Sequence, residues 1–293
     1  MPPTIPERRL PPPAAEVPLL AWLVDVLRPM NRTRVKQLLR HGLVSVNGTS
    51  TTRHDHFVRP GDSITIARAA EARHSPVDLA IVYEDDEVIA IDKPPGLLAV
   101  ATETEKLDTA FTRLAAVLDA RSAGRPFVVH RLDRETSGLL LFARSAEVRD
   151  RFQQAWDAVE KTYLAVVEGV PRPAEGTIEN HLIEGMNLRV RVGRPGGAAK
   201  LAVTHYRLLA SRGAHSLVEV KLGTGRKHQI RVHLAGLGCP VIGDPDYGAK
   251  TNPARRLGLH AWKLALAHPV TGESLNLESP LPAALKRLAP FSG

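Results

Sequence analysis

Residues 129–144 read Val-His-Arg-Leu-Asp-Arg-Glu-Thr-Ser-Gly-Leu-Leu-Leu-Phe-Ala-Arg, and the rest of the chain is organised around this stretch. Its second half, Leu139 to Ala143, is an apolar run of strand length that follows a Ser-Gly pair. Charged and titratable side chains are packed just before the run, from His130 to Glu135. An exposed turn with solvated charges is the ordinary explanation. A core strand has no need of a carboxylate between two arginines, so the pattern also suggests a functional loop.

Composition restricts the class of protein. The chain has 293 residues, of which 43% are hydrophobic, enough for a large domain with a small one. Cys239 is the single cysteine, which excludes an internal disulfide and a cysteine zinc cluster and suits a reducing cytoplasm. The sequence has no apolar run near the ~20 residues that span a bilayer, so no membrane association is expected. The net charge of +8 suggests a polyanionic partner.

The first quarter of the chain is the most basic part. Residues 1–75 carry 11 Lys and Arg against 6 Asp and Glu. The proline-rich residues 1–15 are predicted to be a disordered tail. After them we expect a buried helix from Leu19 to Leu27 and a second helix between Asn31 and Gly42. A strand ending in an Asn-Gly hairpin turn follows, with another strand from Ser63 to Ile66. The cations of the second helix are Arg32, Arg34, Lys36 and Arg40.

Residues 69–77 have the composition of a linker, and a larger domain is expected from residue 78 to 293. Two strands around an acidic turn should open it and end at Lys93-Pro94-Pro95-Gly96. Ser145 is placed to cap a helix, and residues 161–169 read as a strand. The glycine-rich residues 185–200 are expected to form a hairpin or loop. A further strand runs into Gly-Thr-Gly-Arg-Lys-His-Gln-Ile-Arg at 223–231, where a helix is expected to follow the glycines.

These pieces resemble the RluA family of RNA pseudouridine synthases, in order and over residues 16–285. Residues 129–144 resemble the catalytic-aspartate motif of that family, 93–97 its first motif and 223–234 its third. Residues 16–68 resemble the small alpha-L RNA-binding domain. The resemblance implies an α+β protein: a small α/β RNA-binding domain followed by the pseudouridine synthase fold, a mixed and largely antiparallel sheet with flanking helices.

The resemblance also implies roles for particular residues. Asp133 would be the catalytic carboxylate, Tyr163 the tyrosine that faces a flipped-out uracil, and Arg231 the partner of Asp133. Arg131 would fill the space that the flipped base leaves. Further substrate contacts are assigned to His130, Arg134 and Lys227, and RNA contacts to Arg32, Arg34, Lys36 and Arg40.

The reaction of that family moves the ribose bond of uracil from nitrogen to carbon without gain or loss of atoms, so no cofactor or metal is expected. His228 and His233 are five residues apart, which does not match the spacing of a helical metal pair. We expect an isomerase in the cytoplasm, a monomer, acting on large-subunit ribosomal RNA. Two alternatives remain open at this stage: a synthase directed at transfer RNA, and a non-catalytic RNA-binding factor for ribosome assembly.

Overall fold

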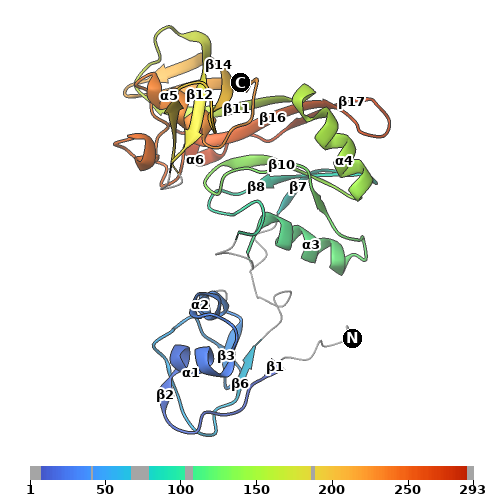
Figure 1. Cartoon of the computed structure of the whole chain (residues 1–293), viewed down its shortest axis with the longest axis vertical. Coiled ribbons are helices and arrows are strands. Elements are labelled where there is room, and N and C mark those ends of the chain that lie inside the picture. The colour runs from blue at the N-terminus through green and yellow to red at the C-terminus, as the bar shows by residue number, and fades with distance from the viewer. Residues whose placement is uncertain (1–7, 41, 67–78, 103–107, 186–188, 289–293) are drawn as a thin grey trace. The chain divides into compact units, whose positions relative to one another are not determined.

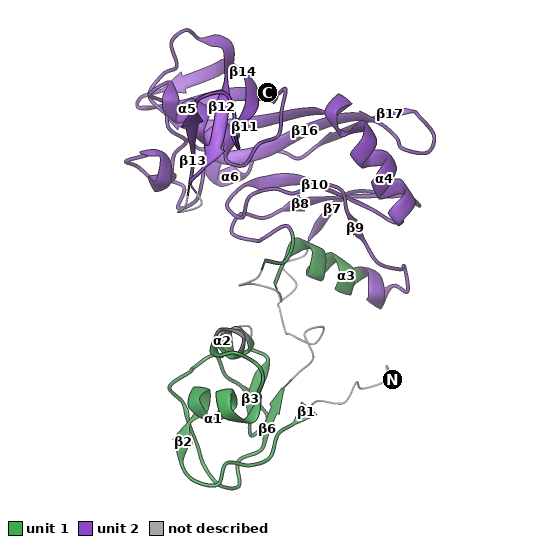
Figure 2. Ribbon diagram, viewed as in Figure 1, with its two compact units in different colours: residues 1–78, 100–117 green, residues 79–99, 118–293 purple. Residues whose placement is uncertain are grey.

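The computed structural model describes residues 8–40, 42–66, 79–102, 108–185 and 189–288 (Figure 1). The chain divides into two compact units, residues 1–78 with 100–117, and residues 79–99 with 118–293 (Figure 2). The predicted linker, 69–77, lies outside the described residues. The domain limits expected from the sequence remain a prediction, and they do not include the grouping of 100–117 with the N-terminal unit.

The N-terminal unit is a small helical and stranded body. Its elements are β1 (Arg8–Arg9), β2 (Val17–Pro18), α1 (Leu19–Val26), α2 (Arg32–Arg40), β3 (Val44–Val46), β4 (Thr49–Ser50), β5 (Phe57–Val58) and β6 (Ile64–Ile66). The two predicted helices are present, and Asn47 and Gly48 both adopt positive φ at the β3–β4 turn. That is the backbone of a hairpin turn with two left-handed residues, which Asn-Gly favours.

The core of this unit is formed by the apolar faces of its two helices and its strands. Val35, Leu38 and Leu39 of α2 are buried together with Leu19 and Leu23 of α1. Lys36 and Arg32 on the same helix are exposed. The apolar stripe predicted for α2 is therefore the packed face, whereas the side chains of Arg34 and Arg40 lie outside the described part of the structure.

One prediction for the N-terminus needs correction. Arg8 and Arg9 pair antiparallel with Ile66 and Thr65 of β6, and Leu10 is buried in the core. Residues 8–10 therefore belong to the fold, although the sequence predicted a disordered tail up to residue 15. A strand of two arginines has no hydrophobic alternation, so the sequence carries no signal for it.

The C-terminal unit is built on one eleven-stranded sheet. The strand order is β13-β12-β14-β15-β11-β16-β10-β8-β7, with β17 paired to β16 and β9 to β10. Its strands are β7 (Ala80–Glu84), β8 (Val88–Lys93), β9 (Phe127–Val128), β10 (Ser137–Ala143), β11 (Glu160–Glu168), β12 (Glu175–Glu184), β13 (Val190–Gly193), β14 (Lys200–Arg212), β15 (His215–Leu222), β16 (Leu259–Ala267) and β17 (Ser274–Glu278). Within this described sheet β10 and β16 pair in parallel, and the other pairs are antiparallel.

The C-terminal unit also contains the helices α4 (Ala146–Ala155), α5 (Gln229–Gly236) and α6 (Ala283–Lys286), with 3-10 turns at η2 (Trp156–Ala158) and η3 (Pro245–Tyr247). Helix α3 (Ala110–Ala120) is mostly grouped with the N-terminal unit. Ser145 caps α4 as predicted, since its hydroxyl accepts the backbone N–H of Val148 at 3.1 Å. Val148 packs with Leu139 and Leu141 of β10, and Ile230 of α5 packs with residues of β11 and β15.

Gly138 shows why a glycine follows Ser137 at the start of β10. It has φ +109°, and a Cβ there would lie 2.2 Å from the carbonyl oxygen of Ala261 on β16. The parallel pairing of β10 with β16 brings the two backbones this close. A side chain at position 138 is therefore disfavoured twice, by the positive φ of residue 138 and by the backbone of Ala261.

We expect Gly138→Ala to destabilise the protein by on the order of 3 kcal/mol, because the added methyl group must push two strands apart. Gly196→Ala is the matched control: Gly196 has φ +112°, nearly the same strain, but nothing within 4 Å of the added Cβ. Urea unfolding of both variants measures the difference. Equal losses would show that strained φ, and not the close approach of β16, sets the cost at position 138.

Candidate active site

Asp133 lies in the loop between β9 and β10, with its side chain 32% exposed. The sheet explains which residues can reach it. Gly138, at the start of β10, is opposite Lys93 of β8 on one side and Ala261 of β16 on the other. Ala261 is in turn opposite Tyr163 of β11. Neighbouring strands are about 4.8 Å apart, so this row places distant parts of the chain beside the loop that holds Asp133.

Lys93 holds the Asp133 loop in place. Its side chain is fully buried, and Nζ donates to the carbonyl oxygens of Pro94 at 3.0 Å, Leu97 at 2.8 Å and Arg134 at 3.1 Å. The backbone N–H of Gly96 also donates to Arg134, at 2.9 Å. Burial lowers the pKa of Lys93 to about 7, against the attraction of nearby carboxylates. The Lys-Pro-Pro-Gly turn is therefore fastened to the residue that follows Asp133.

A second network fixes the start of β10. His260 Nε2 lies 3.0 Å from the carbonyl oxygen of Ser279, so this nitrogen carries hydrogen and Nδ1 is the acceptor. The hydroxyl of Ser137 then donates to Nδ1 at 2.8 Å, and Arg256 donates to the same hydroxyl. Burial lowers the pKa of His260, which keeps the ring neutral as this arrangement requires. The Asp133 loop is thus anchored at its C-terminal end as well.

Tyr163 on β11 is partly buried and packs against the cluster that contains Ile230 and Val220. Burial, and then the negative charge of Asp133, raise the pKa of its phenol well above the ordinary value. The hydroxyl therefore stays neutral at physiological pH. Because the charge of Asp133 acts on the pKa of Tyr163, the two side chains lie within electrostatic range of each other.

Arg231 is paired differently from the expectation. Its Nε donates to Oδ2 of Asp244 at 2.7 Å and its Nη2 to Oδ1 at 2.7 Å, a bidentate ion pair in which Asp244 has no exposed side-chain area. Burial opposes the charge of Arg231, but Asp244 outweighs it and raises the pKa, with a smaller contribution from Asp133. Asp133 is thus near Arg231, but the direct ion pair implied by the resemblance is replaced by Arg231–Asp244.

His228 approaches the Asp133 carboxylate. Its Nε2 lies 3.8 Å from Oδ2 of Asp133, and its Nδ1 lies 2.9 Å from the hydroxyl of Tyr247. Burial lowers the pKa of His228, and the attraction of Asp133 does not offset it. The guanidinium of Arg231 lies 4.8 Å from the centre of the Tyr247 ring. Asp133, His228, Tyr247 and Arg231 therefore form one connected group.

Two side chains that were predicted to contact the substrate, His130 and Lys227, interact with other groups of the protein. His130 Nε2 accepts the backbone N–H of Leu141 at 3.0 Å, and its ring stacks on Trp156 at 4.5 Å between centroids. Burial lowers the pKa of His130 to about 3, so the ring is a neutral acceptor within the fold. Lys227 precedes α5, not within it as expected, and its ammonium group pairs with Glu184.

Arg131 and Arg134 differ from these two residues. Both are exposed, and among the described residues neither guanidinium has a hydrogen-bond or ion-pair partner. Arg131 acts electrostatically on Glu184, the carboxylate with which Lys227 pairs. Both arginines flank Asp133 closely in the chain. They are therefore available to a polyanionic ligand.

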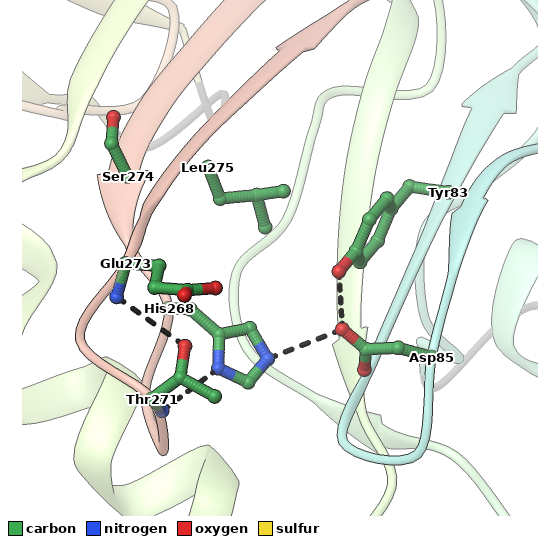
Figure 3. A pocket seen from close by; sticks show the side chains of 7 residues that line it. All are labelled: Tyr83, Asp85, His268, Thr271, Glu273, Ser274 and Leu275. Carbon is green, nitrogen blue, oxygen red and sulfur yellow. Dashed lines mark hydrogen bonds and ion pairs between the residues drawn. The ribbon is translucent and has the colours of Figure 1, made fainter.

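A cavity of about 360 Å³ lies at the other end of the sheet strands (Figure 3). It is lined by Tyr83, Asp85, His268, Thr271, Glu273, Ser274 and Leu275. Asp85 sits in the β7–β8 turn, beside the Ala143 end of β10, whereas Asp133 precedes the Ser137 end. Seven strand residues separate the ends, roughly 20 Å. The cavity is therefore separate from the group around Asp133.

The residues facing this cavity are already bonded to one another. The hydroxyl of Tyr83 donates to Asp85, and His268 Nε2 lies 3.2 Å from the same carboxylate (Figure 3). Burial opposes the charge of Asp85, but Tyr83 and two backbone N–H groups hold its pKa below the ordinary value. We interpret these contacts as structural interactions that hold the β7–β8 turn against the β16–β17 turn.

No group of three or more His, Cys, Asp or Glu residues in the described part of the chain is arranged to hold a metal ion. None of the helices within the described ranges is long and apolar enough to cross a membrane.

Comparison with known proteins identifies the class. The family model described as RNA pseudouridylate synthase matches residues 87–236, which include the Asp133 loop, Tyr163 and Arg231. The structure is similar to that of human RNA pseudouridylate synthase domain containing 4, with a TM-score of 0.59 and 30% identity over 71% of this chain and 92% of the other. The predicted fold, a largely antiparallel mixed sheet with flanking helices, is confirmed.

Relatives of similar length extend the match over nearly the whole chain. The chain is 36% identical to the uncharacterized RNA pseudouridine synthase YlyB of Bacillus subtilis, over 91% of both chains. It is 33% identical to the ribosomal large subunit pseudouridine synthase D of Xanthomonas campestris pv. campestris, over 92% of this chain and 86% of the relative. The chain therefore belongs to the RNA pseudouridylate synthase family, and its activity is that of an isomerase.

Three residues of the site escaped the sequence analysis. Lys93 was noted only as part of a motif that could be a simple strand terminator. Asp244 stands in Gly-Asp-Pro-Asp-Tyr-Gly, beside a second carboxylate, with nothing in the sequence to show which of them binds Arg231. His228 was considered only as a metal ligand. Its place directly after a glycine turn and before a helix was the available signal.

Proposed function

We propose that Asp133 is the catalytic carboxylate of this synthase and that it acts on a uridine flipped out of a structured RNA. The supporting observation is that two segments far from Asp133 in the sequence approach the loop that carries it. These are Tyr163 on β11, and His228 with Arg231 at the start of α5. A base inside a helix cannot reach such a pocket, so the target must be unpaired or flipped.

The residues suggest a division of labour in the proposed reaction. Asp133, 32% exposed, can be reached by a substrate. Tyr163 would stack on the uracil with a neutral phenol, and its hydroxyl would help to remove the proton from the carbon that becomes attached to the ribose. Arg131, exposed and without a partner in the described residues, would enter the space left by the base. Arg134 would contact the adjoining phosphates.

Large-subunit ribosomal RNA is the substrate we propose. Several relatives that cover most of this chain are named ribosomal large subunit pseudouridine synthase D. Transfer RNA is the second candidate. Pseudouridine mapping in total RNA from cells with and without this gene tests both: a site lost from the large ribosomal RNA supports the proposal, and a loss confined to transfer RNA would overturn it.

The N-terminal unit is proposed to be an RNA-binding domain of the alpha-L kind. Its second helix exposes Arg32 and Lys36 to solvent, whereas its apolar stripe is buried. With Arg34 and Arg40, the helix carries four cations in nine residues. Such a surface binds phosphates without reading sequence, so its contribution should be electrostatic.

We expect replacement of Arg32 and Lys36 by Gln to raise KM and leave kcat unchanged, the pattern of lost uniform binding. The dependence of log affinity on log salt should become less steep by about 0.7 per lost contact on single-stranded RNA. Arg53 and Arg59 are the control. They are exposed in the same unit but already paired with Asp55 and Glu16, so their replacement by Gln should change the salt slope little. A fall in kcat with an unchanged salt slope would contradict an RNA-binding role for the helix.

A further inference from the structure

His228 has an unusual backbone. It stands immediately before α5 with φ +52° and ψ +16°, in the left-handed region, although it is not a glycine. Residues other than glycine are strained in such conformations, and strained residues cluster at functional sites. The side chain is 17% exposed. The fold thus holds an imidazole rigidly at the bend between β15 and α5.

The hydrogen bonds of Tyr247 assign the hydrogen on the His228 ring. The hydroxyl oxygen of Tyr247 accepts the backbone N–H of Val190 at 3.0 Å. Its own hydrogen is then free to be donated to Nδ1 of His228, 2.9 Å away. A neutral imidazole that accepts at Nδ1 carries its hydrogen at Nε2. Burial favours this neutral form.

The hydrogen on Nε2 is on the side of the ring that approaches Asp133. Nε2 and Oδ2 of Asp133 are 3.8 Å apart, beyond a hydrogen bond by less than 1 Å. Within the part of the chain that the structure describes, the Asp133 carboxylate has no side-chain hydrogen bond and no other ion-pair contact, and the nearby guanidinium of Arg231 is engaged by Asp244. Catalytic hydrogen bonds are often long in the absence of substrate and shorten in the complex.

We propose that His228 is a positioning residue for Asp133. In the complex with RNA, its neutral ring would donate Nε2–H to Oδ2 and fix the plane of the carboxylate, which would leave Oδ1 directed to the substrate. A neutral donor orients the carboxylate and leaves its negative charge intact. A bidentate arginine would orient the carboxylate too, but it would neutralise that charge. Tyr247 sets the hydrogen position on the ring, and Asp244 keeps Arg231 from taking the place of His228. This proposal rests on the role proposed for Asp133.

The test compares His228→Gln with His228→Leu. Both side chains are of similar size and share the same backbone strain, but only Gln carries an N–H donor at a position close to Nε2. The assay is single-turnover release of tritium from a large-subunit ribosomal RNA transcript labelled at uridine C5, at saturating protein. The Leu variant should lose about 10²-fold in rate with unchanged RNA affinity, as expected for a misplaced reacting group. The Gln variant should regain most of the rate.

Tyr247→Phe is a second variant that leaves position 228 intact. It should lower the rate without weakening RNA binding, because the ring of His228 loses the donor that fixes its hydrogen. A Leu variant as fast as the wild type, or a Gln variant as slow as Leu, would overturn the proposal; if neither variant folds, an unchanged rate for Tyr247→Phe would do so. Asp133→Asn is assayed in parallel. Turnover by that variant would instead refute the proposed function, so the two failures are distinguishable.

Discussion

Asp133→Asn should abolish pseudouridine formation while RNA binding is retained. The substitution keeps the size of the side chain and removes only the charge on which the chemistry depends. We expect the single-turnover rate to fall by at least about 10⁴-fold, or about 5.4 kcal/mol of activation free energy at 1.36 kcal/mol per factor of ten. The measurement is tritium release from C5-labelled transcript, together with RNA affinity by filter binding.

Glu135→Gln is the matched control for this experiment. It removes a carboxylate from the same loop, two residues further on, where the side chain is exposed and, within the described chain, forms no ion pair or hydrogen bond. Its rate should remain near that of the wild type. Equal losses in the two variants would mean that the net charge of the loop matters and that Asp133 has no special part. If Asp133→Asn were as active as the wild type, Asp133 could not be the catalytic carboxylate.

Local patterns in the sequence predicted several elements of both units. The helices α1 and α2, the Asn47-Gly48 turn, the Ser145 cap and the strand that carries Tyr163 are all present. Each depends on interactions between residues close in the chain: an apolar periodicity, a side-chain cap or a turn that needs positive φ. The strand β1 was missed because Arg8 and Arg9 acquire their structure only by pairing with a strand more than fifty residues away.

The partners of charged side chains could not be predicted in the same way. Arg231 acts within reach of Asp133, Asp244 and Asp246, and only the tertiary structure decides that Asp244 forms the bidentate pair. Lys93 reads in the sequence as the end of a strand. Its burial beneath the Asp133 loop depends on the pairing of β8 with β10 and on the carbonyl group of Arg134. The pairing of charged side chains depends on burial and on tertiary geometry, and neither produces a periodic pattern in the sequence.

The ion pair between Arg231 and Asp244 gives the largest expected effect on stability. Its two side chains are 9% and 0% exposed, so removing one leaves a buried charge without compensation. Arg231→Leu should therefore cost on the order of 3–5 kcal/mol in the free energy of urea unfolding. Asp244→Asn in the same chain removes the orphaned charge, so the double variant should regain much of the loss.

The identity of the rescuing residue distinguishes two arrangements of the site. If Arg231 pairs with Asp244, as in the structure, only Asp244→Asn should restore stability to Arg231→Leu, and the effects of Asp133→Asn and Arg231→Leu should be nearly additive. If Arg231 pairs with Asp133, as the family resemblance implied, the rescue should come from Asp133→Asn instead. A double-mutant cycle for each carboxylate measures the coupling directly. Coupling of Arg231 to Asp133 alone would show that the guanidinium is the partner of the catalytic carboxylate, and His228 would then lose the place proposed for it.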